Sequence, residues 1–193
     1  KVVLRGGLHG SEDPEQLARL KREAELLARL DHPHVVRVHA ADFSSDPAYV
    51  VVDLLPGGSL EERLRQGPLP IPDAVGIGRK LAGALAHAHA RGVLHRDVKP
   101  ANVLFDDRGE PRLVDFGLAK ADATSRVLTA TGQVIGTPVY MSPEQALGLQ
   151  VDARADVYGL GVLLWSMLTG RPPHLGASVT EVLARVTRDP LEP

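Results

Sequence analysis

The sequence of 193 residues contains no cysteine and carries almost no net charge. The absence of cysteine excludes disulfides, thiol catalysis and cysteine-ligated zinc, and it fits a reducing compartment. The 22 basic and 24 acidic side chains leave a formal net charge of −2, which gives no electrostatic case for binding nucleic acid or a membrane surface. We therefore expect no nucleic acid among the partners and no membrane contact within this segment.

Long apolar runs and a signal peptide are also missing. The longest apolar stretch, VYGLGVLLWSML at 157–168, is shorter than the roughly 18 residues that cross a bilayer. The sequence starts at Lys1, without a methionine. We interpret the chain as a cytoplasmic segment of a longer protein, and leave open a transmembrane segment of that protein outside this window.

The apolar pattern predicts an α+β chain with enough hydrophobic residues, 44%, for a real core. Strand patterns and turn signals occupy most of the first part, and helical patterns dominate the rest. We expect strands at 1–7, 35–43, 48–55, 103–105 and 111–119. We expect helices at 11–31, 59–64, 71–92, 152–170 and 178–189, the second of them after the turn signal Pro-Gly-Gly at 56–58. The helix at 152–170 is apolar nearly all round, so we expect it to be buried.

The stretch GVLHRDVKPANVLF, residues 92–105, concentrates charged and polar side chains between two apolar flanks. Val93–Leu94 and Val103–Phe105 are typical of short buried strands. Pro100 lacks a backbone donor and pushes Lys99 away from helical geometry. The pattern predicts a tight loop fixed between two strands, which is a common position for catalytic groups.

Four motifs occur in one order: HRDVKPAN at 95–102, DFG at 115–117, GTPVYMSPEQ at 136–145 and DVYGLG at 156–161. A three-residue DFG alone is weak, but the ordered set is specific, and the chain resembles a bacterial, eukaryotic-like (Hanks-type) serine/threonine protein kinase domain. The resemblance covers almost the whole chain. It implies a bilobal fold, truncated at both ends, with a partial small β-rich lobe, αC helix and hinge at 1–55 and a partial, mainly α-helical large lobe at 56–193.

The resemblance implies roles for the polar residues of the loop. Asp97 would accept the proton of the substrate hydroxyl, and Lys99 would steady the transferred phosphoryl group and favour Ser/Thr over Tyr substrates. Asn102 and Asp115 would supply oxygen ligands to Mg²⁺ or Mn²⁺.

Lys1 would bind the α- and β-phosphates of ATP, held by an ion pair with Glu23. Glu23 falls on the apolar stripe of the helix predicted at 11–31, and a partner would explain a carboxylate there. The alternative, that Glu23 reaches water at the edge of the stripe, stays open. By the same resemblance, the residues around adenine are Val52 at the back, the backbone of Asp53 and Leu55 at the edge, and Leu104 below; apolar side chains at these positions are equally ordinary core residues.

The Thr-, Ser- and Ala-rich stretch at 122–134 has no periodicity and resembles an autophosphorylated activation loop. Thr129 and Thr131, just before Thr137 of the GTPVY motif, are the candidate phosphorylation sites. Arg96, beside Asp97, would pair with the phosphate. A plain solvated loop is the alternative.

The sequence contains 8 histidines, and none of those that we considered is expected to be catalytic. His95 would hold the loop by hydrogen bonds, and His32 and His34 favour a structural turn over a metal site. His87 and His89, two residues apart on a helix, are interpreted as surface or packing residues.

The sequence thus predicts an ATP-dependent protein serine/threonine kinase that acts on protein substrates. A kinase–kinase dimer is a further possible partner, and we expect the isolated chain to be weakly active or inactive. The alternative is a pseudokinase that serves as a binding or scaffolding module. The complete set of Lys1, Glu23, Asp97, Asn102 and Asp115 argues against that alternative, because pseudokinases usually lack one or more of these residues.

Overall fold

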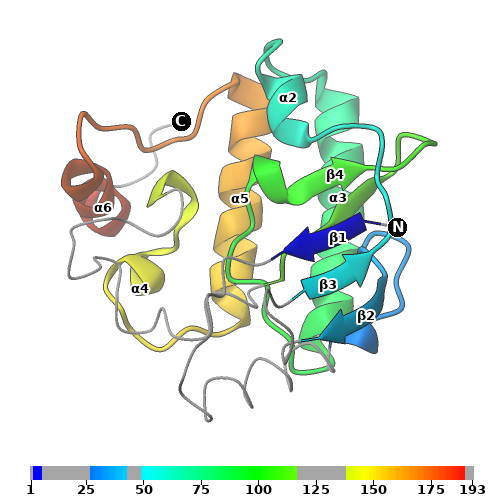
Figure 1. Cartoon of the computed structure of the whole chain (residues 1–193). Helices are drawn as coiled ribbons and strands as arrows, with labels where there is room; N and C mark the ends of the chain where they lie inside the picture. The colour runs from blue at the N-terminus through cyan, green and yellow to red at the C-terminus, as the bar shows by residue number, and fades with distance from the viewer. Residues whose placement is uncertain (1, 6–26, 43–48, 117–137, 190–193) are drawn as a thin grey trace.

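The computed structural model describes residues 2–5, 27–42, 49–116 and 138–189. The first part of the chain forms a three-stranded antiparallel sheet with the strand order β1-β3-β2. Its strands are β1 (Val2–Arg5), β2 (Val38–Asp42) and β3 (Tyr49–Val52). Strands rich in β-branched valine fit this pleated arrangement, and Figure 1 shows the three strands side by side in front of α3 (Ile71–His89).

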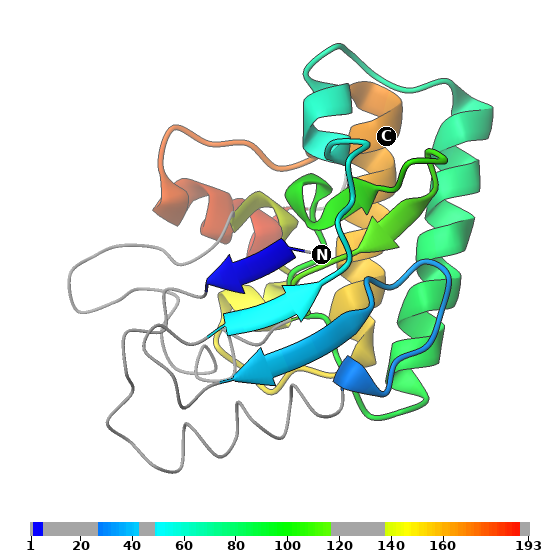
Figure 2. The same cartoon turned by 45° about the vertical axis from the view of Figure 1, so that its right-hand side comes forward.

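The helical part is built around two long antiparallel helices, α3 and α5, which lie side by side in Figures 1 and 2. Three shorter helices, a two-stranded hairpin and two 3₁₀ turns make up the rest of this helical part. In chain order, the elements of the helical part are α2 (Leu60–Leu64), α3 (Ile71–His89), η1 (Pro100–Asn102), β4 (Val103–Phe105), β5 (Pro111–Leu113), η2 (Pro138–Tyr140), α4 (Pro143–Ala146), α5 (Ala153–Thr169) and α6 (Val179–Arg188).

The main core lies where α3 faces α5 and the β4–β5 hairpin. One stripe of α3, spaced by three or four residues, is buried, as expected for an amphipathic helix. The fully buried members of this core include Leu81, Val103, Leu113, Leu163 and Met167. The hairpin is thereby fixed against α3, and the loop that precedes β4 starts from a rigid base.

Helix boundaries follow the capping signals in the sequence. Ser59 and Ser142 form capping boxes with Glu62 and Gln145. The α5 helix ends at Gly170, whose φ of 77° suits glycine. The predicted helices at 71–92, 152–170 and 178–189 are therefore confirmed to within a few residues, and so are the strands at 35–43 and 48–55 as β2 and β3.

Val93–Leu94 is not a strand, contrary to the sequence prediction. The Val93 N–H donates to the Ala88 carbonyl at the end of α3, at 3.0 Å. The next donor with a described partner, the His95 N–H, binds the Asp156 carboxylate at 2.8 Å. These backbone donors are satisfied by a helix end and a side chain, so no neighbouring strand is needed.

The helix predicted at 152–170 is buried on one face rather than all round. Leu163 and Met167 are fully buried, but Val157 is 62% exposed and Leu168 is 39% exposed. A helix buries only the surface that other elements cover, and α3 covers one side of α5. None of the described helices is long and apolar enough to cross a membrane.

Candidate active site

The loop between α3 and β4 brings together the two predicted catalytic side chains, Asp97 and Lys99, and the predicted metal ligand Asn102. The Lys99 Nζ lies 2.9 Å from the Asp97 Oδ2. The Asn102 side-chain NH₂ donates to the Asp97 carbonyl oxygen at 2.9 Å and to its Oδ2 at 3.1 Å. Asp97 is thus oriented by an amide and a cation from its own loop, with its carboxylate 16% exposed.

His95 holds this loop from below, as the sequence predicts. It is fully buried, and its Nε2 lies 3.0 Å from the Val114 carbonyl oxygen, which can only accept. Its Nδ1 accepts the Asp97 N–H at 3.2 Å. This pair of bonds requires the neutral Nε2–H tautomer, and burial lowers the pKa of His95 against the opposing effect of Asp156 and Asp97.

Asp156, on the first turn of α5, anchors the same loop and was missed by the sequence reasoning. It is 2% exposed. Its carboxylate accepts the backbone N–H of His95 at 2.8 Å and of Arg96 at 2.7 Å, and it pairs with the His89 Nε2 at 2.7 Å. An acidic residue on an otherwise apolar helix was the available signal. His89 is therefore a hydrogen-bonding partner of Asp156, which the interpretation as a surface or packing residue did not include.

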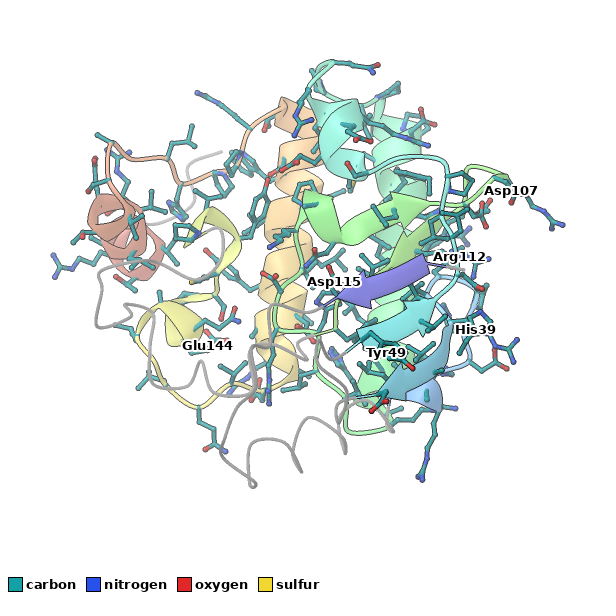
Figure 3. The ribbon with its side chains drawn as sticks, in the orientation of Figure 1. His39, Tyr49, Asp107, Arg112, Asp115 and Glu144 are labelled. Carbon is teal, nitrogen blue, oxygen red and sulfur yellow. The ribbon has the colours of Figure 1, made fainter. Side chains whose placement is uncertain are left out.

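Asp115 lies two residues after the end of strand β5, with Val114 between them. The Val114 N–H donates to the Asn102 carbonyl at 3.0 Å, and the Phe116 ring packs on His95 with centroids 4.5 Å apart. Figure 3 shows Asp115 between the sheet and α5. Desolvation raises the pKa of Asp115, an effect that the positive charge of Lys99 opposes.

Asn102 and Asp115 suit a hard divalent cation. The Asn102 NH₂ is turned to Asp97, which leaves the amide oxygen as its ligand atom, and the partly desolvated Asp115 carboxylate gains from a nearby positive charge. No group of three His, Asp or Glu side chains among the described residues could hold a metal alone. A divalent cation with only one or two protein ligands would complete its coordination shell with phosphate and water.

The predicted adenine residues also come together. Val52, Leu55 and Leu104 belong to one apolar cluster that extends to Val114. The Asp53 N–H donates to the Arg37 carbonyl at 3.2 Å, so a ligand contact at this residue falls to the Asp53 carbonyl.

The Asp53 side chain contacts another residue, with its carboxylate 2.7 Å from the His39 Nε2.

Five predicted site residues lie outside the described residues, namely Lys1, Glu23, Thr129, Thr131 and Thr137.

The histidines before β2 form a cluster with α3. The His32 Nδ1 accepts the His34 N–H at 3.2 Å, and the His34 Nδ1 lies 2.9 Å from the Pro111 carbonyl. The His32 and His87 rings lie 5.2 Å apart. These contacts fit the predicted structural turn and place His87 as a packing residue.

A model of the protein kinase domain matches residues 8–191. The chain belongs to the protein kinase family. This domain is 42% identical over 99% of its length to the serine/threonine-protein kinase PknB of Mycobacterium leprae. It is 44% identical over 90% to PkaA of Streptomyces coelicolor and 40% identical over 88% to PknL of Mycobacterium tuberculosis, both also named serine/threonine-protein kinases.

The kinase domain spans 31%, 32% and 43% of the length of these three relatives. Its fold is that of the family, with a small sheet-containing lobe and a helical lobe. Protein kinases in general use ATP and a divalent metal, and the residues around Asp97 are consistent with both.

Proposed function

We propose that this kinase domain transfers the γ-phosphate of ATP to serine and threonine hydroxyls of protein substrates. The observation that carries the proposal is the convergence of Lys99 and Asn102 on the carboxylate of Asp97, within 2.9 Å and 3.1 Å. The printed names of its relatives support the same reaction.

Asp97 would orient the substrate hydroxyl and accept its proton as the oxygen attacks phosphorus. Its carboxylate is held by hydrogen bonds and little exposed, which suits a base fixed in one position. Lys99, already beside Asp97, would neutralise charge on the transferred phosphoryl group.

Asn102 and Asp115 would hold Mg²⁺, or Mn²⁺ in its place, through oxygen atoms. The bound cation would supply positive charge to the phosphates of ATP. The hydrogen bond from the Val114 N–H to the Asn102 carbonyl would hold the segment that carries Asp115 next to the segment that carries Asn102.

The nucleotide would lie between the sheet and the β4–β5 hairpin. Val52, Leu55 and Leu104 would contact adenine through the apolar cluster described above, and the Asp53 carbonyl would meet its edge. We keep the Lys1–Glu23 ion pair as the proposed grip on the α- and β-phosphates.

Regulation by phosphorylation of Thr129 or Thr131 is a further part of the proposal. A phosphate there would bring roughly −1.5 to −2 charge and could pair with Arg96, next to Asp97, and Thr137 would be a further contact of this loop. Mass spectrometry of the active protein is expected to find phosphate between Asp115 and Glu144. Full activity of a double variant, Thr129→Ala with Thr131→Ala, would contradict this regulation.

We also propose the organisation and setting of the domain. Residues 1–55 would form the part of the small lobe and hinge present here, and 56–193 the part of the large lobe. The domain would act in the cytoplasm, where ATP is available, and a second kinase molecule could be a partner. The sequence gives no electrostatic reason for contact with nucleic acid or membrane.

The decisive experiment is Asp97→Asn in the protein expressed over its full coding length. We expect kcat to fall by about 10²–10⁴-fold because a positioned base is lost, while the Kd of Mg·ATP changes by less than about two-fold. Asp107→Asn, on an exposed turn (Figure 3), is the matched control and should leave kcat unchanged. A wild type that binds Mg·ATP without turnover would instead favour a pseudokinase.

A further inference from the structure

Gln145 joins helix α4 to the catalytic loop across 49 residues of sequence. Its side-chain NH₂ donates to the Arg96 carbonyl oxygen at 2.8 Å. Its other amide atom, Oε1, accepts the Ser142 N–H at 3.1 Å and so completes the capping box of α4. One planar amide therefore serves two separate elements.

The group that Gln145 binds belongs to the peptide unit that leads into Asp97. In this unit the Arg96 carbonyl accepts from Gln145, and the Asp97 N–H donates to the His95 Nδ1 at 3.2 Å. Both polar ends of the peptide plane are thus tied to side chains. Because the Asp97 Cα is bonded to this plane, its rotation sets the direction of the carboxylate.

The backbone at this point is strained without such ties. Arg96 has a φ of 63°, a left-handed conformation that is unfavourable for a non-glycine residue. Such conformations persist where surrounding contacts over-determine them. The Arg96 N–H is held by Asp156 at 2.7 Å and its carbonyl by Gln145, so α5 and α4 clamp the residue from its two ends.

We propose that Gln145 is a positioning residue for phosphoryl transfer, which fixes the Arg96–Asp97 peptide and thereby aims the Asp97 carboxylate. The inference rests on the proposed kinase activity. It assigns to Gln145 an effect on the reacting geometry, separate from its part in capping α4.

The two roles can be separated by substitution. Gln145→Glu keeps an oxygen for the Ser142 N–H, since Glu is a normal capping-box residue, but it replaces the NH₂ that binds Arg96. Ser142→Ala does the reverse: it removes the hydroxyl that accepts the Gln145 N–H at 3.4 Å and leaves the bond to Arg96 in place. Both variants are made in the protein expressed over its full coding length.

We expect Gln145→Glu to lower kcat by about ten-fold or more, with the KM for ATP and the calorimetric Kd of Mg·ATP within about two-fold of wild type. Ser142→Ala should lower the thermal midpoint and leave kcat within about two-fold. If Gln145→Glu fails to fold, Gln145→Met, which has similar length and no donor, takes its place with the same expected kcat.

Three results would overturn the role. One is an unchanged kcat in Gln145→Glu, and another is an equal loss of kcat in Ser142→Ala, which would reduce Gln145 to a helix cap. A loss seen only in ATP affinity would also exclude it. An inactive wild type would overturn both this role and the proposed function, whereas an active wild type that loses kcat with Asp97→Asn but not with Gln145→Glu would overturn the role alone.

Discussion

Replacement of Asp156 by asparagine tests whether the catalytic loop depends on a buried carboxylate of α5. Asn has nearly the same shape, so the change removes charge and one acceptor without opening a cavity. In the favourable orientation, the remaining oxygen keeps the bonds to the His95 N–H and to His89, and the new NH₂ faces the Arg96 N–H, another donor.

The size of the effect follows from these contacts. A buried donor left without an acceptor costs about 1–3 kcal/mol, and the two retained bonds each lose their charged acceptor, which is worth about 1 kcal/mol per bond. Together these terms predict a loss of about 3–5 kcal/mol in the free energy of unfolding. This corresponds to a decrease of roughly 6–20 °C in the thermal midpoint.

Urea denaturation followed by circular dichroism, together with a thermal scan, measures both quantities for wild type and Asp156→Asn. The control is Asp152→Asn at the N-cap of the same helix, where the side chain is 56% exposed and Asn caps as well as Asp; it should change stability by less than about 1 kcal/mol. If Asp156→Asn were as stable as this control, the carboxylate would not anchor the loop and the reasoning would be refuted.

Three further predictions concern stability elsewhere. Gly57→Ala should destabilise by about 1–3 kcal/mol because a Cβ there would lie 2.7 Å from the Asp106 carbonyl oxygen; an unchanged urea midpoint would contradict the close approach. Gly76→Ala, in α3 with open space around the new Cβ, should raise stability by about 0.5–1 kcal/mol, and a lower midpoint would count against it. Burial, with two neighbouring histidines, lowers the pKa of His32 from 6.5, so the unfolded chain takes up a proton there more readily than the folded one; stability should be full above pH 6.5 and decline as the pH falls below it. His32→Asn should weaken this decline in urea midpoints between pH 7.5 and 5.5, and an unaltered decline would exclude His32 as a source.

Much of the fold could be predicted because local signals dominate it. An aspartate N-cap and a terminal glycine mark α5 in the sequence, and a serine N-cap marks α6. Both helices also show apolar residues spaced by three or four positions. The short strands β2 and β3 follow from valine-rich runs between turn signals. These features depend on residues within one helical turn or one strand, so the local sequence is enough to predict these elements.

The candidate site was predictable where its residues are close in sequence. Asp97, Lys99 and Asn102 lie within six positions of the sequence. In the structure, the side-chain nitrogens of Lys99 and Asn102 lie within 3.1 Å of the Asp97 carboxylate. The prediction failed for Val93–Leu94, because the Val93 N–H binds the end of α3 rather than a neighbouring strand. It also failed for the outer face of α5, because the sequence pattern gives apolarity but not which face another element covers.

The sequence by itself therefore determined the family of the chain and the loop that carries the candidate catalytic residues. Only the tertiary structure decided how that loop is held: Asp156 reaches the His95 backbone across 61 residues, and Gln145 reaches Arg96 across 49. Such contacts depend on how α5 and α4 pack around the loop, and the packing of elements distant in the chain is set by the shape of the whole core rather than by any local pattern.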